Sequence, residues 1–194
     1  YSFLRDTAKD REGALCYFVG QGNEFVLVDG IGQASMFLYD CAKARGDDDV
    51  RAFGLGQLEL FLRHAIDERS GLPYHGCVLS DDGRGAEETR QGIIGWGRGV
   101  GWLLLGMSRY VELREHTLAI ADAARRLQLE DGLWAWQLGA TGGPRDTSGT
   151  SMIAYSLDLA SAGGEELVGR AVEGVLASVG GDGRLTMCLD DGRG

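Results

Sequence analysis

The sequence has little of the features that mark nucleic-acid-binding proteins. It holds only 19 Lys and Arg against 29 Asp and Glu, a formal net charge of -10, and no stretch rich in Lys or Arg. Binding to a nucleic-acid backbone depends on cations that displace its counterions, so we expect no nucleic-acid partner. An anionic ligand would need a local arginine.

Long hydrophobic runs are also missing. The longest strongly apolar stretch, Trp102 to Met107, is far shorter than the roughly 20 residues that span a bilayer. We therefore expect a soluble chain that does not enter a membrane. No secretory leader is visible, but the chain begins at Tyr1 without an initiator methionine, so its localisation stays open, with the cytoplasm slightly favoured.

The four cysteines form no C-x-x-C pair and have no histidine at a metal-binding spacing. They are Cys16, Cys41, Cys77 and Cys188. This scatter favours reduced, partly buried thiols and predicts neither a zinc site nor another metal site.

Glycine, in contrast, is abundant, with 32 residues, about twice the usual share. Four glycines follow polar residues and precede short apolar or aromatic runs: Gly13, Gly71, Gly132 and Gly183, which are 58, 61 and 51 residues apart. Each pattern predicts a turn with glycine at a positive φ, followed by an extended return. We call these the four repeat loops.

Apolar residues at helical spacing lie between the repeat loops and predict at least six helices. The patterns run through residues 34–41, 55–66, 102–113, 118–127, 152–159 and 167–176. A repeat of this length must stack on its neighbours, in an open solenoid or a closed toroid. We expect an all-α toroid of helical hairpins. A six-hairpin ring needs roughly 330 residues, so residues 1–194 are predicted to form one incomplete domain.

The stretch from Trp96 to Trp102 places Arg98 between two indoles and three glycines. A guanidinium binds a carboxylate with two hydrogen bonds, and indoles stack on sugar rings, so the trio suits an acidic saccharide. A glycine-rich helix contact with two core tryptophans explains the same residues.

Asp29 follows an apolar run and precedes a helix that we expect to open near Ala34. It is either a helix-entry aspartate that bonds free backbone N–H groups, or a partly desolvated carboxyl that donates and later accepts a proton. Residues alone favour the first interpretation.

His75 closes the second repeat loop, where it could bind a ligand hydroxyl, act as an acid or base, or serve structure alone. Trp134 and Trp136 alternate in the third loop, so one faces the core and the other the ring's mouth. Asp146 to Ser151 are typical of a helix start.

Together these segments resemble the unsaturated glucuronyl and rhamnogalacturonyl hydrolases, glycoside hydrolase families 88 and 105. The resemblance rests on Val28 to Gly30, Gly71 to Gly76, Trp96 to Trp102, Gly132 to Trp134, and Asp146 to Met152. It implies an (α/α)6 barrel and a substrate that ends in a 4,5-unsaturated uronic acid, left by a polysaccharide lyase.

The resemblance also implies a mechanism without metal or cofactor. One aspartic acid protonates the vinyl ether at C4 and then activates water for addition at C5, giving a hemiketal that collapses with loss of the sugar. By position Asp29 corresponds to that acid, and the substrate-binding residues are His75, Trp96, Arg98, Trp102 and Trp134. The partner would be an acidic oligosaccharide.

The sequence departs from this family at several places. Leu27 and Gln33 stand where members usually carry an aromatic residue and a methionine, and a second active-site aspartate of the family lies upstream of the matched region. A non-catalytic glycan-binding module and a helical scaffold for protein partners therefore stay open as alternatives. An incomplete ring exposes apolar helix faces, so a chain that is truly this short is expected to form a homo-oligomer or to aggregate.

Overall fold

The computed structural model describes residues 2–10, 12–17, 25–81 and 86–188 of the chain. Its helices and strands follow the order α1 (Ser2–Asp6), β1 (Phe25–Leu27), α2 (Val28–Arg45), α3 (Asp48–His64), β2 (Gly76–Asp81), β3 (Ala86–Gln91), α4 (Gly97–Met107), the 3-10 turn η1 (Val111–Leu113), α5 (Arg114–Leu127), α6 (Thr147–Leu159) and α7 (Gly164–Ala177). The all-α prediction and its six helices are confirmed.

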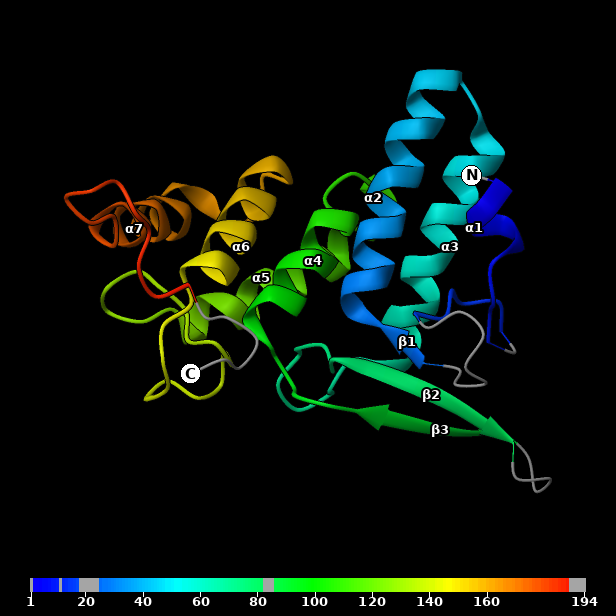
Figure 1. The fold of residues 1–194 in the computed structure, drawn as a ribbon, viewed down its shortest axis with the longest axis horizontal. Helices are drawn as coiled ribbons and strands as arrows, with labels where there is room; N and C mark the ends of the chain where they lie inside the picture. Colours follow the sequence, from blue (N-terminus) through cyan, green and yellow to red (C-terminus); the bar gives the residue numbers. More distant parts are fainter. Residues whose placement is uncertain (1, 11, 18–24, 82–85, 189–194) are drawn as a thin grey trace.

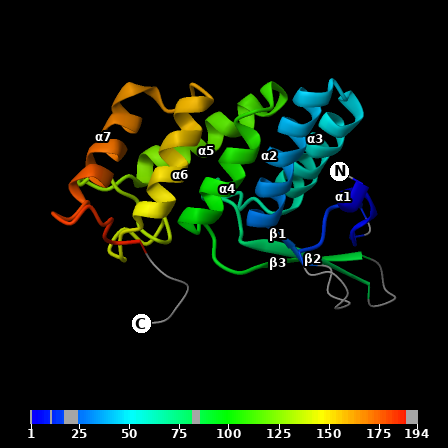
Figure 2. The same ribbon diagram turned by 45° about the horizontal axis from the view of Figure 1, so that its top comes forward.

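Three helices lie side by side in the order α2, α4, α6, and each is followed by a second helix, α3, α5 or α7 (Figures 1 and 2). The amino-terminal ends of α2, α4 and α6 lie on the same side of the molecule as the sheet and the loops (Figure 2). We call α2, α4 and α6 the inner helices and this side the loop face. The arrangement is an arc of helical hairpins, as expected for part of a toroid.

Glycines let the inner helices cross at short range. A β-carbon on Gly32 of α2 would collide with the carbonyl of Trp102 on α4. One on Gly101 of α4 would lie 2.6 Å from Cβ of Met152 on α6. Only glycine permits such backbone approach, which accounts for part of the high glycine content.

The four repeat loops have the predicted turn. Their glycines have φ of 94° at Gly13, 73° at Gly71, 80° at Gly132 and 78° at Gly183. In the third loop Leu129 N donates to Leu133 O and Gly132 N donates to Leu129 O, at 2.9 and 3.0 Å. The first and fourth loops bond in the same way, and the second is one residue longer. Local sequence therefore sets the turn four times over.

Two helix boundaries differ from the prediction. The helix expected near Ala34 begins at Val28, because Leu27 ends β1 in extended conformation and Val28 N donates to His75 O at 2.9 Å. The helix expected through residue 113 ends at Met107. Tyr110 leaves the helix axis and donates its hydroxyl to Ser35 O on α2.

A three-stranded antiparallel sheet, β1-β2-β3, was not predicted. The second return continues into the β2–β3 hairpin, in which Gly76 pairs with Gln91, and β1 adds to the other edge of β2, where Leu27 pairs with Gly76. This sheet joins the second repeat loop to the start of α2. It thereby places His75 beside Asp29 in the chain fold.

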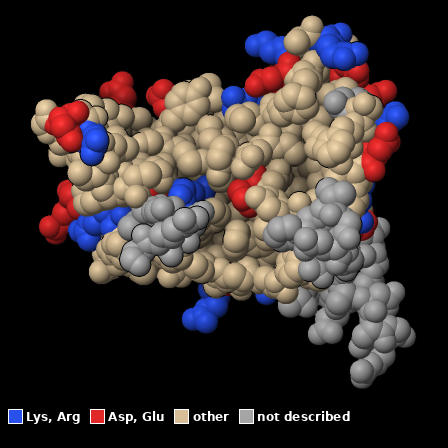
Figure 3. All heavy atoms as spheres, viewed as in Figure 1, with Lys and Arg blue, Asp and Glu red and all other residues tan. Residues whose placement is uncertain are grey.

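The surface is unevenly charged. Charged side chains gather over the ends of α2 and α3 and around α7 (Figure 3). The middle of the face seen there is mostly uncharged, apart from an acidic group at its centre and a basic group beside it. None of the helices within the described ranges is long and apolar enough to cross a bilayer. The four thiols are free, and burial raises the pKa of Cys77 to about 11, so this thiol stays protonated at neutral pH.

Candidate functional site

Asp29 lies in the first turn of α2, with its side chain partly buried. Its Oδ1 is buried and has no hydrogen-bond partner among the described residues. A buried carboxylate oxygen without a partner is costly, and such atoms in native proteins often serve function. The carboxyl is therefore not explained as a helix cap.

His75 is held next to Asp29 by the backbone. Its carbonyl accepts the N–H of Val28, the residue before Asp29, at 2.9 Å. The loop that carries His75 is fixed from within, since Ser70 donates its hydroxyl and its N–H to Asp67 at 2.6 and 2.9 Å. The hydroxyl bond is the main cause that lowers the pKa of Asp67. The imidazole thus stands on a loop that is held by its own hydrogen bonds.

Trp96 and Arg98 continue the site from His75 onto α4. The rings of His75 and Trp96 meet edge to face with centroids 5.0 Å apart, and the guanidinium of Arg98 lies 5.2 Å from the Trp96 ring. The indole Nε1 of Trp96 is buried without a hydrogen-bond partner within the described ranges. The cation–π contact of Arg98 with Trp96 and the edge-to-face contact of Trp96 with His75 place three recognition groups in one row.

Contacts at Gly99 connect this row to α2. A β-carbon at Gly99 would lie 2.9 Å from both the Trp96 ring and Cγ1 of Val28. Trp96 therefore lies close to Val28, the residue that precedes Asp29. The structure brings Asp29, His75, Trp96 and Arg98 to the ends of α2 and α4 on the loop face.

Trp102 lies four residues after Arg98, so both side chains project from the same side of α4. Its side chain is partly exposed, and its carbonyl faces Gly32 of α2. Trp102 thus lies one turn further along α4 than Arg98, where α4 crosses α2.

The prediction that Trp134 binds substrate is wrong. Its side chain is 1% exposed, and its indole N–H donates to Ala124 O on α5 at 2.8 Å. A ring enclosed in the core cannot stack on a sugar. Trp136, two residues later, is partly exposed, and its carbonyl accepts the N–H of Gly97 at the start of α4 at 2.7 Å.

Tyr17 was missed by the sequence analysis. A β-carbon at Gly30 would lie 2.8 Å from its ring, so this aromatic residue packs beside the residue that follows Asp29. A signal was available, because Tyr17, His75 and Trp136 each come four residues after the glycine of a repeat loop. Aligning the loops would have selected all three.

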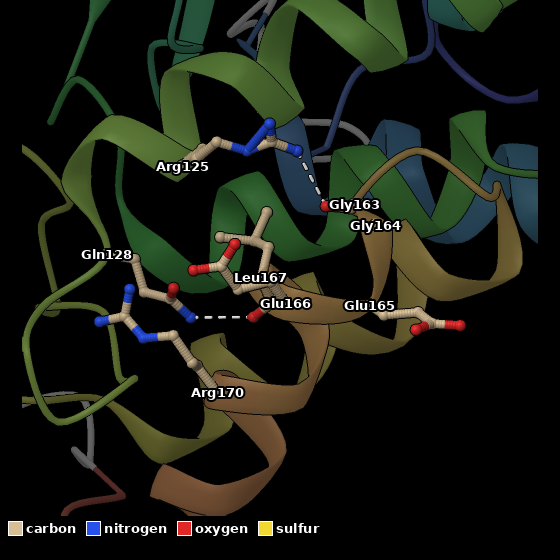
Figure 4. A pocket seen from close by; sticks show the side chains of 8 residues that line it. All are labelled: Arg125, Gln128, Gly163, Gly164, Glu165, Glu166, Leu167 and Arg170. Carbon is tan, nitrogen blue, oxygen red and sulfur yellow. Dashed lines mark hydrogen bonds between the residues drawn. The ribbon is translucent and has the colours of Figure 1, made fainter.

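A pocket between α5 and α7 lies apart from these residues (Figure 4). Arg125 donates to Gly163 O at 2.8 Å, and Gln128 donates to Leu167 O at 3.0 Å. These bonds tie the end of α5 to the start of α7. Within the described residues no three His, Cys, Asp or Glu side chains gather as a metal site.

Comparison with known protein families gives a match to Glycosyl Hydrolase Family 88 over residues 4–189. The chain belongs to glycosyl hydrolase family 88. A comparison with curated proteins found no match.

Solved structures share the fold of this family 88 chain. A possible member of family GH105 from Salmonella enterica serovar Paratyphi A has a TM-score of 0.82 at 18% identity, covering 100% of this chain and 56% of that one. The unsaturated glucuronyl hydrolase of Bacillus sp. GL1, responsible for glycosaminoglycan degradation, has a TM-score of 0.65 at 20% identity, covering 82% and 48%. An unsaturated glucuronyl hydrolase specific for heparin has a TM-score of 0.71 at 19% identity, covering 91% and 52%. The chain spans about half the length of these structures.

Proposed function

We propose that this chain contributes the catalytic acid and the carboxylate-binding arginine of a hydrolase that acts on unsaturated uronyl oligosaccharides. The observation that carries the proposal is the unpartnered Oδ1 of Asp29, set at the loop face beside the row of His75, Trp96 and Arg98. Family 88 membership and structural neighbours that include unsaturated glucuronyl hydrolases support the same substrate class.

In the proposed reaction Asp29 donates its proton to C4 of the terminal unsaturated sugar. Water then adds at C5 of the sugar and returns a proton to Asp29. The product of this addition is a hemiketal at C5. Collapse of the hemiketal releases the next sugar. The fork of Arg98 binds the sugar carboxylate, and the indole of Trp96 supports both the guanidinium and the sugar ring.

The decisive experiment follows the ultraviolet absorbance of the double bond in lyase-generated unsaturated disaccharides. Asp29→Asn keeps the shape of the side chain but removes the proton donor, so turnover should fall by about 100-fold or more. Equal rates for both proteins would overturn the role of Asp29. Binding without any loss of absorbance in the unmodified protein would instead select a non-catalytic glycan-binding module.

Arg98→Ala and Arg98→Lys test the binding half of the proposal. Both should weaken binding of the acidic sugar more than binding of its neutral, carboxyl-reduced counterpart. Lysine should recover only part of the affinity, because it keeps the charge but lacks the two-pronged geometry. Calorimetric titration gives these affinities independently of turnover, and equal losses for both sugars would contradict the role of Arg98.

A further inference from the structure

One position in the repeat loops bonds to the amino-terminal end of each inner helix. The carbonyl four residues after the loop glycine accepts the first helical N–H. His75 O accepts from Val28 of α2 at 2.9 Å, Trp136 O from Gly97 of α4 at 2.7 Å, and Met187 O from Thr147 of α6 at 3.0 Å. The three loops thus place equivalent residues over three neighbouring helix ends. Trp136 is the counterpart of His75 one inner helix further along the arc.

Burial separates this position from the residues just before it. In the first three loops the residue two after the glycine is buried: Leu15, Pro73 and Trp134. The residue four after it is at least partly exposed in the same loops: Tyr17, His75 and Trp136. The fourth position is therefore where each return reaches the loop face.

The backbone around Trp136 fixes its place between α4 and α6. The next residue, Gln137, pairs with Trp96, and the preceding residue, Ala135, pairs with Arg145, just before α6. Trp136 accordingly adjoins the first turn of α4, which carries Arg98, on the side away from α2 and Asp29. Packed helix axes are about 8–10 Å apart, which is more than the width of one sugar ring.

We propose that the indole of Trp136 stacks on the sugar unit next to the unsaturated uronyl residue and so helps to select the leaving sugar. This inference rests on the proposed function, because Asp29 and Arg98 define where the uronyl unit lies. A flat indole matches the apolar face of a pyranose and carries no charge, so it suits a neutral sugar. Trp136 then acts on affinity for the second sugar, while the reacting bond stays with Asp29.

The test compares an unsaturated disaccharide with the methyl glycoside of the same unsaturated uronate, which lacks the second sugar. Trp136→Ala should raise the dissociation constant and KM of the disaccharide by about five- to tenfold. The dissociation constant of the methyl glycoside and the kcat for the disaccharide should be unchanged. Trp136→Phe should recover most of the affinity, and Trp136→Leu, which keeps apolar volume for folding but has no aromatic face, should not.

Phe37→Ala, which removes an exposed aromatic residue of α2, is the matched control and should change the affinity for neither sugar. Unchanged disaccharide binding in Trp136→Leu, or equal losses for both sugars, would overturn the inference. Calorimetric binding tests the role of Trp136 separately from the proposed function. If the unmodified protein binds both sugars without turnover, the catalytic proposal fails, while the affinities of the Trp136 variants still show whether Trp136 contacts the second sugar. If the unmodified protein binds neither sugar, both proposals are overturned.

Discussion

The third and fourth repeat loops have the same backbone turn but opposite surroundings. Trp134 and Leu185 both lie two residues after the loop glycine, yet Trp134 is 1% exposed and Leu185 is 40% exposed. The third loop is enclosed by α5 and α6, since Trp134 bonds to Ala124 O and to Thr150. The fourth loop stands at the end of the arc (Figure 1). The turn is thus a local property, whereas burial of its apolar residues depends on neighbouring hairpins.

The largest effect that can test this comparison concerns the two apolar residues. Trp134→Ala should lower the free energy of unfolding by about 3–5 kcal/mol, because it leaves a cavity in the core and an unpaired carbonyl at Ala124. Leu185→Ala should cost under about 1 kcal/mol, as is usual for exposed sites. Urea denaturation of both variants measures the difference, and similar losses would show that the fourth loop is buried in solution.

A second pair contrasts the loop glycines themselves. Alanine at a positive φ costs about 1–2 kcal/mol, so this is the loss expected for Gly183→Ala, where a β-carbon meets no atom within 4 Å. Gly132→Ala should lose about 1–3 kcal/mol more, because its β-carbon would collide with the Arg170 carbonyl. Thermal melts would contradict this account if the two variants behaved alike.

An apolar groove on the surface of α6 and α7 also predicts self-association. A groove between α6 and α7 is lined mainly by apolar residues, among them Tyr155, Val172 and Leu176, and Leu176 is 65% exposed. An apolar surface of this kind favours association in water. Leu176→Asp should lower the average mass in concentration-dependent light scattering, whereas Val111→Asp, at a residue outside the groove that is 75% exposed, should not. A chain that is monomeric at all concentrations would refute the expected homo-oligomer.

The smallest effect concerns the first repeat loop, which an ion pair ties to α3. Glu12 lies 2.9 Å from His64 and 3.2 Å from Arg63, and the hydrogen bond with His64 is the main cause that lowers the pKa of Glu12. A lowered carboxyl pKa stabilises the fold above the unfolded value, and this contribution is lost as pH falls through the folded value. Glu12→Gln should therefore cost under about 1 kcal/mol at neutral pH and nothing at strongly acidic pH. Melts across the acidic range would show a constant difference if the pair had no role.

The site was predicted in unequal parts. Resemblance selected Asp29, His75, Trp96 and Arg98, and the structure brings these residues to one face, but their roles remain proposals. Trp134 was assigned wrongly, because alternation along an extended run says that one of two indoles is buried without saying which. The register of the repeat loops, with Leu15 and Pro73 buried at the matching position, would have decided it.

By itself the sequence determined what depends on near neighbours. Helical spacing gave the six helices, and polar residues before glycine gave four turns with positive φ, because both follow from backbone and side-chain chemistry within a few residues. Tertiary structure alone decided where α2 begins, which indole is enclosed, and which residues join Asp29. These outcomes depend on contacts such as Val28 with His75, between residues 47 positions apart, whose free energy exists only once the helices have packed.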